Sequence, residues 1–184
     1  MFAECFLYHN FLSEDDCDQI INESKNLAEQ AKVQSNEGMD GFIETSTHRN
    51  SKIKFYYEDN KITNYIKQEL RQIATDIYKF PIGEIQPLQY TLYDKDMFYN
   101  WHVDSTGDFS KTEWDRDLSA TILLNNPDEY VGGELQFKTP INETTVQLNK
   151  GSIVVFPSLT IHRVTKVETG IRHSLVAWST RYLL

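Results

Sequence analysis

A histidine and an aspartate stand two residues apart at His102 and Asp104, inside the aromatic and β-branched stretch 99–104. Such a stretch favours a β-strand, in which side chains two residues apart point to the same face. The imidazole and the carboxylate would then reach a common point and offer two neighbouring ligands to a metal ion. A second histidine would complete the two-histidine, one-carboxylate set that suits non-haem Fe(II) and leaves coordination positions open.

The pair alone is a weak signal, because the chain has five histidines and chance supplies such a match readily. An exposed histidine–aspartate pair at a strand edge would have the same pattern. His162 is the other histidine in a β context with short polar neighbours, just after the turn at Phe156-Pro157-Ser158. The remaining residues of the chain therefore have to decide between the two interpretations.

Arg172 and Ser174 follow the Gly170 turn and share one face of a predicted strand. A planar guanidinium is suited to gripping a carboxylate with two hydrogen bonds. Arg172 could also be a surface cation on a hairpin. Val176 and Trp178 continue the same face, however, so we expect Arg172 at the end of a mostly apolar pocket, where its charge requires an anionic partner.

The first half of the chain predicts two helices. Ser13 can cap the first, over about 14–31, and acids in its first turn suit the helix dipole. An apolar period of 3.6 residues predicts the second over 60–80, ended by Pro81. Between them, 33–51 lacks such a period and is expected to form a loop or a hairpin arm.

From Leu88 onward the pattern changes to about eight short strands, expected at 88–93, 97–103, 118–124, 134–137, 144–148, 152–156, 161–167 and 171–182. The polar segment 105–117 is expected to be a loop that could act as a lid. Asn149-Lys150-Gly151 has the chemistry of a tight hairpin turn, and 168–170 is expected to be a second turn. Helices followed by strands indicate a mainly β, α+β domain spanning 1–184, with a helical support region at 1–84 and a strand core at 85–184.

Composition excludes several classes of protein. Apolar residues make up 40% of the chain, as in a folded domain. The net charge of -9 disfavours binding to nucleic acid or to an anionic membrane, and mildly favours a basic partner. The N-terminus lacks a signal-peptide pattern and no segment is long and apolar enough to span a bilayer, so we expect a cytoplasmic protein with reduced Cys5 and Cys17. Nothing in the sequence indicates the oligomeric state.

Taken together, these residues resemble the Fe(II)- and 2-oxoglutarate-dependent dioxygenases, specifically the prolyl 4-hydroxylase-like branch. The resemblance covers nearly the whole chain and is most specific over 88–178. Each matching residue is weak by itself, but the ordered set is specific. It comprises Tyr93, Asp96, Tyr99, His102, Asp104, Asn125, Gly132, Gly133, Phe137, Gly151, Phe156, His162, Gly170, Arg172, Ser174 and Trp178.

The resemblance implies a double-stranded β-helix, or jelly roll, with the N-terminal helices packed against one sheet. It implies Fe(II) held by His102, Asp104 and His162. Arg172 would pair with the distal carboxylate of 2-oxoglutarate, with Ser174 and the Tyr93 hydroxyl as further contacts. The implied cofactors are Fe(II), 2-oxoglutarate, O2 and, optionally, ascorbate.

Three positions depart from the family pattern. Asp96 stands where the family commonly has glycine, which leaves the geometry of that turn open. A tyrosine that some relatives carry is absent from 121–123, where this chain has Thr-Ile-Leu. Arg172 replaces the lysine that this branch often uses, and it still supplies the cation.

The resemblance implies hydroxylation of an unactivated C–H bond with release of succinate and CO2. The implied substrate is a prolyl or other side chain of a protein or peptide, and free amino acids or other small molecules are alternatives. Two further alternatives are a non-catalytic jelly-roll binding or structural module and a cupin-like metalloenzyme that does not use 2-oxoglutarate. Candidate substrate contacts are Arg49, Trp101, Trp178 and the 105–117 loop.

Overall fold

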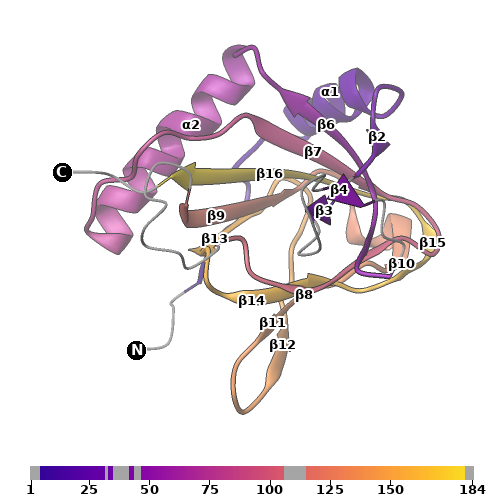
Figure 1. Cartoon of the computed structure of the whole chain (residues 1–184). Helices are drawn as coiled ribbons and strands as arrows, with labels where there is room; N and C mark the ends of the chain where they lie inside the picture. Colours follow the sequence, from indigo (N-terminus) through magenta and orange to yellow (C-terminus); the bar gives the residue numbers. More distant parts are fainter. Residues whose placement is uncertain (1–4, 32, 35–41, 44–46, 106–114, 181–184) are drawn as a thin grey trace.

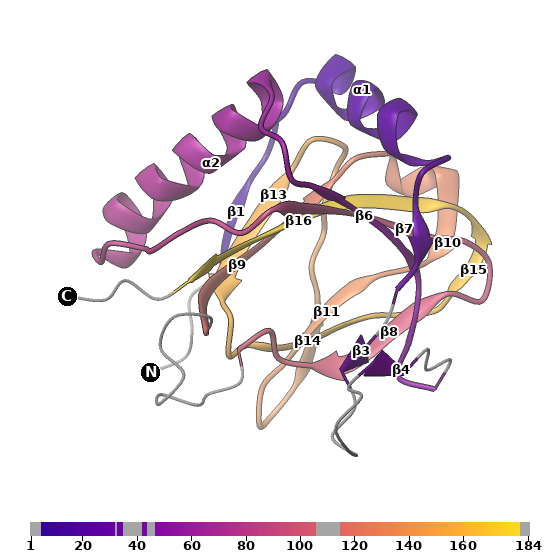
Figure 2. The same cartoon turned by 45° about the horizontal axis from the view of Figure 1, so that its top comes forward.

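The computed structural model describes residues 5–31, 33–34, 42–43, 47–105 and 115–180. Two antiparallel sheets face each other, and two helices cover the outer face of the larger sheet (Figures 1 and 2). The larger sheet has the order β1-β13-β9-β16-β7-β6-β2. Its strands are β1 (Phe6–Tyr8), β13 (Ile153–Pro157), β9 (Arg116–Leu123), β16 (Arg172–Thr180), β7 (Leu88–Tyr93), β6 (Lys52–Tyr56) and β2 (Glu29–Gln30).

The smaller sheet has the order β12-β11-β14-β8-β5. Its strands are β12 (Glu143–Thr145), β11 (Leu135–Lys138), β14 (Ile161–Val164), β8 (Phe98–His102) and β5 (Arg49–Asn50). Two further strand pairs join β10 (Tyr130–Gly132) to β15 (Val167–Gly170) and β3 (Val33–Gln34) to β4 (Phe42–Ile43). This arrangement confirms the expected mainly β fold, a double-stranded β-helix with helices packed against one sheet.

The helices begin where their capping residues predict. The Ser13 side chain accepts a hydrogen bond from the Asp16 backbone N–H at the start of α1 (Glu14–Ser24). Asn60 and Thr63 form a reciprocal capping box at the start of α2 (Lys61–Ile73), which continues as a π-helical segment, η1 (Ala74–Tyr78). A short 3-10 helix, η2, spans Pro127–Glu129. Neither described α-helix is long and apolar enough to cross a bilayer.

The prediction that the first helix reaches residue 31 was wrong, because α1 ends at Ser24. Leu27, which falls within the predicted helix, has a side chain that is 63% exposed and belongs to neither apolar core. Beyond it the chain forms the edge strand β2, which pairs with β6. A periodic apolar residue without a surface to cover does not extend a helix.

Two layers of apolar side chains explain why the central strands are buried on both faces. On β13, Ile153 and Val155 belong to the core beneath the helices, whereas Val154 and Phe156 belong to the core between the sheets. The strand therefore appears in the sequence as a continuous apolar run. Burial on both faces fixes its register, since a shift by one residue would exchange the two cores.

Two turns connect differently from the prediction. The Ser152 N–H donates to the Asn149 carbonyl oxygen at 2.9 Å, so the turn exists. It leads from β12 to β13, which lie in different sheets, and the expected hairpin is therefore wrong. The expected turn at 168–170 is instead part of β15, which pairs with β10. Turn chemistry reverses the chain but does not choose the partner strand.

The N-terminal region, expected to be a helical support, also supplies strands to both sheets. β1, β6 and β2 join the larger sheet and β5 joins the smaller one. Asp96 has a φ of 64°, and its backbone N–H donates to the Val167 carbonyl oxygen at 2.8 Å. Aspartate tolerates this left-handed conformation better than most residues, so Asp96 forms this turn without a glycine.

A buried polar pair on the helix side of β16 predicts how stability responds to pH. The Tyr90 hydroxyl lies 2.6 Å from Nδ1 of His173, and burial lowers the pKa of His173 from 6.5 to about 4. Between these values the unfolded chain binds a proton that the folded chain does not, so stability falls as pH falls. We expect His173→Gln to reduce the loss of unfolding free energy between pH 7 and pH 4.5 by up to about 3 kcal/mol.

Urea titrations at the two pH values measure this difference. His9→Gln, which replaces an exposed histidine, is the matched control. Equal pH responses in the two variants would show that His173 is not the group that remains neutral in the folded chain.

Candidate active site

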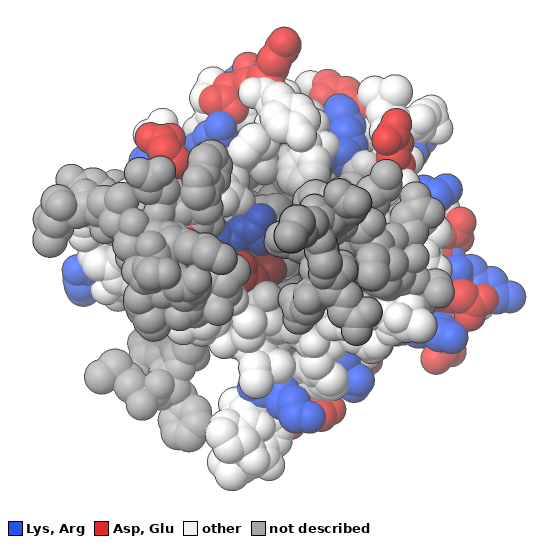
Figure 3. All heavy atoms as spheres, in the orientation of Figure 1, with Lys and Arg blue, Asp and Glu red and all other residues white. Residues whose placement is uncertain are grey.

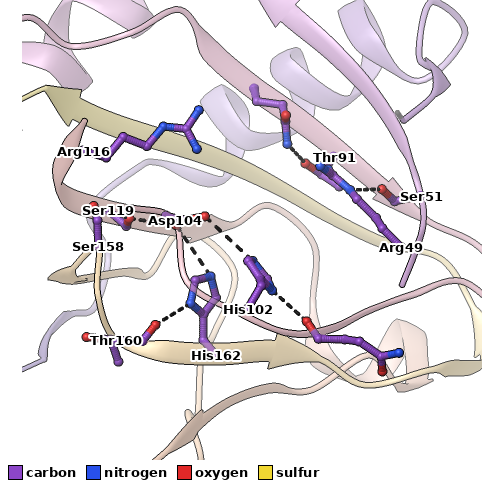
Figure 4. Close-up of polar contacts among 12 residues, drawn as sticks. Arg49, Ser51, Thr91, His102, Asp104, Arg116, Ser119, Ser158, Thr160 and His162 are labelled. Atoms are coloured by element: carbon purple, nitrogen blue, oxygen red, sulfur yellow. Dashed lines mark hydrogen bonds and ion pairs between the residues drawn. The ribbon is translucent and has the colours of Figure 1, made fainter. Parts of the chain in front are cut away.

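The two histidines meet because β8 and β14 are neighbours in the smaller sheet, with His102 directly opposite His162. Asp104 follows β8 and is held by its backbone N–H, which donates to the Ser158 carbonyl oxygen at 2.8 Å. Oδ1 of Asp104 lies 3.7 Å from Nε2 of His102, and Oδ2 lies 3.6 Å from Nε2 of His162. The three ligand atoms lie within 4.8 Å of one another, close enough to share one metal ion (Figure 4).

Each imidazole is oriented by its own strand. Nδ1 of His102 lies 2.7 Å from the Asn100 carbonyl oxygen, and Nδ1 of His162 lies 2.8 Å from the Thr160 carbonyl oxygen. A carbonyl oxygen only accepts hydrogen bonds, so both Nδ1 atoms donate and both Nε2 atoms present lone pairs to the centre. Metal-binding histidines commonly have this arrangement.

The Asp104 carboxylate is held in its ionised form. The Ser119 hydroxyl donates to Oδ2 at 2.7 Å and contacts the Ser158 hydroxyl at 2.8 Å (Figure 4). Burial alone would raise the pKa of Asp104, but His162, His102 and the Ser119 hydrogen bond outweigh it and lower the pKa below the usual range. The carboxylate is therefore ready to bind a cation at neutral pH.

His102 is held in its neutral form. Burial and the nearby His162 lower the pKa of His102 to about 3. The His102 ring stacks on the ring of Tyr99, with centroids 3.5 Å apart. The guanidinium of Arg49, which lies on β5, is 4.6 Å from the centroid of the Tyr99 ring. A neutral imidazole in a fixed plane is the form that binds a metal ion.

Arg172 and Tyr93 lie opposite each other on β16 and β7. Arg172 is 1% exposed, and its Nη1 donates to the Ser174 hydroxyl at 2.8 Å. The structure thus brings together the three residues that the family pattern assigns to the co-substrate. Gly133 makes room for Arg172, because a Cβ at that glycine would lie 3.1 Å from the arginine Cδ.

In the described part of the chain, no ion pair joins Arg172 to a carboxylate. A buried guanidinium without an acidic partner is costly unless a ligand supplies the negative charge. This observation fits a carboxylate-bearing co-substrate such as 2-oxoglutarate.

The His102–Asp104–His162 group and Arg172 share one cavity of about 930 Å³ between the sheets. Figure 3 shows a hollow on this face of the molecule, with acidic and basic atoms visible inside it. The even-numbered residues of β16 from 172 to 178 line the cavity, as their shared face predicts. Cavity-lining residues on the strands of the larger sheet are Glu29, Gln30, Ile53, Lys54, Phe55, Gln89, Thr91, Tyr93, Arg116, Thr121, Arg172, Ser174, Val176 and Trp178.

The three candidate substrate residues lie in different places. Arg49 and Trp178 line the cavity. Trp101 does not, because it lies beside the Arg163 guanidinium, 4.3 Å from its ring centroid, and near Lys138. Trp101 therefore lies apart from the other site residues. Most of the proposed 105–117 lid, and much of the 33–51 arm, falls outside the described residues.

Sequence reasoning missed Arg116, which begins β9 and lines the cavity. Its guanidinium lies 3.8 Å from the Trp178 ring centroid, and its Nε donates to Oε1 of Gln86 at 3.0 Å. The residue was counted in a polar loop, where an arginine is normally solvated. Strict alternation would have placed Arg116 on the face of Leu118, which packs in the core beneath the helices. An irregularity in the pairing of β9 with β16 at this point puts Arg116 on the cavity side instead, so the sequence pattern carried no signal for it.

With this geometry established, comparison with known proteins identifies the class. The chain belongs to the 2OG-Fe(II) oxygenase superfamily, whose family model matches residues 88–180. A PKHD-type hydroxylase from Crocosphaera subtropica is 37% identical over 94 residues, which are 51% of this chain and 42% of that relative. The chain thus spans less than half the length of this curated relative.

Solved structures share the fold over nearly the whole chain. A prolyl-4-hydroxylase from Pseudomonas putida has a TM-score of 0.75 at 20% identity, covering 99% of this chain and 95% of that one. A prolyl hydroxylase from Trichoplax adhaerens, in complex with a peptide fragment of hypoxia inducible factor, has a TM-score of 0.73 at 13% identity. That alignment covers 96% of this chain and 83% of the other.

The superfamily implies Fe(II), 2-oxoglutarate and O2, and the residues present fit the first two. His102, Asp104 and His162 supply the nitrogen and oxygen donors of a facial non-haem iron site. Arg172 supplies the buried cation that a dicarboxylate requires. The comparisons and the site geometry do not test a requirement for ascorbate, which stays a prediction.

The contact between Ser119 and Asp104 predicts a measurable effect on metal binding. We expect Ser119→Ala to weaken Mn(II) binding about 10-fold, because the carboxylate loses the hydrogen bond that fixes its orientation. Electron paramagnetic resonance titration of free Mn(II) measures the dissociation constant. Ser158→Ala is the control, because that hydroxyl contacts Ser119 and not Asp104. Wild-type affinity in Ser119→Ala would show that the backbone alone orients Asp104.

Proposed function

We propose that this chain is an Fe(II)- and 2-oxoglutarate-dependent dioxygenase that hydroxylates an unactivated C–H bond and releases succinate and CO2. The observation that carries the proposal is the presence of two sites in one cavity. A His–Asp–His group lines it, and so does a buried arginine without an acidic partner in the described part of the chain. Neither a simple binding module nor a cupin-like site that does not use 2-oxoglutarate requires both features.

The protein residues have separate tasks in this proposal. Bound Fe(II) with 2-oxoglutarate and O2 supplies the oxidising chemistry. His102, Asp104 and His162 would hold the metal. Arg172, with Ser174 and Tyr93, would bind the far carboxylate of the keto acid and so orient it.

The proposed substrate is a prolyl or another side chain of a peptide, with free amino acids and other small molecules as alternatives. The cavity of about 930 Å³ has room for a substrate side chain beside the co-substrate. A peptide complex exists for a neighbour of the same fold. Arg49 and Trp178 are the proposed substrate contacts because both line the cavity. Trp101 stays a prediction, since it contacts Arg163 outside the cavity.

The first test is an anaerobic titration with Fe(II) followed by 2-oxoglutarate, monitored through the visible metal-to-ligand charge-transfer band. We expect the band in the wild type and its loss in His102→Ala. Arg172→Ala should weaken 2-oxoglutarate binding about 100-fold, because a buried charge-assisted hydrogen-bond pair is removed. Arg172→Lys should lose less, since the positive charge remains.

Arg163→Ala is the matched control, because it removes one positive charge from outside the cavity. Iron binding without a band would support a metalloenzyme that does not use 2-oxoglutarate. Absence of both iron and 2-oxoglutarate binding would favour a non-catalytic jelly-roll module and end the enzyme proposal.

A further inference from the structure

Three arginine side chains reach the same cavity from three different strands. Arg172 comes from β16, Arg116 from β9 and Arg49 from β5. Among the described residues, the carboxylates that line the cavity belong to Asp104 and to the exposed Glu29 on the edge strand β2. The cavity is therefore rich in cations, although the whole chain carries a net charge of -9.

When Fe(II) and 2-oxoglutarate are bound, as the proposed function requires, the positive charges of two of these arginines have no negative counterpart among the described cavity residues. Fe(II), the Asp104 carboxylate, the 2-oxoglutarate dianion and Arg172 together sum to zero charge. Arg49 and Arg116 remain, and among the described residues no ion pair joins either to a carboxylate. Arg49 is only 8% exposed, so water compensates its charge poorly.

Both guanidinium groups are held in place and, as far as the described residues go, keep hydrogen-bond donors without a partner. The Nε of Arg49 donates to the Ser51 hydroxyl at 2.8 Å, and its guanidinium lies over Tyr99. Arg116 uses its Nε on Gln86 and lies over Trp178. In the described part of the chain, no hydrogen bond involves the Nη atoms of either residue. Stacking on an aromatic ring fixes the guanidinium plane and leaves these donors free.

The indole N–H of Trp178 adds a third kind of donor. It is buried without a hydrogen bond of ordinary geometry, and it lies close enough to the Asp104 carboxylate to help lower the pKa of that group. Figure 4 shows Arg116 and Arg49 on either side of the Asp104 and His102 pair, the part of the site that faces the open cavity. These groups all donate hydrogen bonds, so the complementary ligand accepts hydrogen bonds and carries negative charge. A carboxylate meets both requirements, and its planar shape matches the paired N–H groups of a guanidinium.

We infer that the substrate presents a carboxylate to Arg49 and Arg116, close to the carbon that is oxidised. The carboxylate can come from an acidic residue of a peptide or from a small carboxylic acid. The acidic net charge favours a basic partner during encounter, but this long-range effect is weaker than contact with desolvated cations inside the cavity. In this inference, Arg49 and Arg116 make the enzyme bind acidic substrates in preference to neutral ones.

Two matched pairs of probes test this inference by calorimetry, with Fe(II) and 2-oxoglutarate bound and O2 excluded. One pair is a short capped peptide with a central proline flanked by glutamates, and the same peptide with glutamines. The other pair is N-acetyl-L-proline and its amide. We expect the acid in at least one pair to bind about 10-fold tighter than its neutral partner. The pair that shows the preference identifies the source of the carboxylate.

The variants assign the preference to residues. Arg49→Gln and Arg116→Gln should each reduce the acid preference at least several-fold and leave the 2-oxoglutarate dissociation constant unchanged. Arg49→Lys should restore part of the preference, whereas Arg163→Gln should have no effect. The charge-transfer band is recorded first in each sample to check that Fe(II) and 2-oxoglutarate are bound. If the wild type shows no band, the result contradicts the proposed function and does not bear on this inference.

Three results would overturn the inference. The first is equal binding of acid and amide in both probe pairs. The second is an acid preference that persists in both glutamine variants. The third is weakened 2-oxoglutarate binding in Arg49→Gln or Arg116→Gln, which would place that arginine in the co-substrate site.

Discussion

The alignment of His102 opposite His162 is the contact on which the rest of the site depends. It places two imidazoles with ring centroids 4.1 Å apart, and each donates its Nδ1 hydrogen to the backbone carbonyl two residues earlier in the chain. For His102 this carbonyl lies in β8, and for His162 it lies immediately before β14, so the local backbone orients both rings. A shift of either strand by one residue would turn one ring away from the cavity and separate the members of the His–Asp–His group.

The two faces of the larger sheet have different roles: the outer face packs against the helices and the inner face lines the cavity. On β16, Leu175 and Ala177 pack beneath the helices, whereas Arg172, Ser174 and Trp178 face the cavity. The helices therefore hold the outer face and leave the inner face free to carry polar groups. A buried arginine without an acidic partner in the described part of the chain reduces stability, and the apolar core under α1 and α2 offsets that cost.

Two arginines that line the cavity rest on aromatic rings beside the His–Asp–His group. The Arg49 guanidinium lies over Tyr99, which stacks on His102, so an aromatic ring separates this cation from the histidine. Arg116 lies over Trp178. Aromatic faces stabilise these guanidinium groups without consuming their hydrogen-bond donors. Among the described residues that line the cavity, cations therefore outnumber carboxylates, although the net charge of the chain is negative.

The sequence by itself determined the local features: the strand that carries His102 and Asp104, the shared face of Arg172 and Ser174, and the capped starts of both helices. These depend on neighbours within a few residues, and period, caps and turns encode them directly. Tertiary structure decided which strands pair, that α1 ends at Ser24, and that Arg116 lines the cavity while Trp101 does not. Those outcomes depend on contacts between residues far apart in the chain, and a local pattern cannot specify which buried surface a side chain will meet.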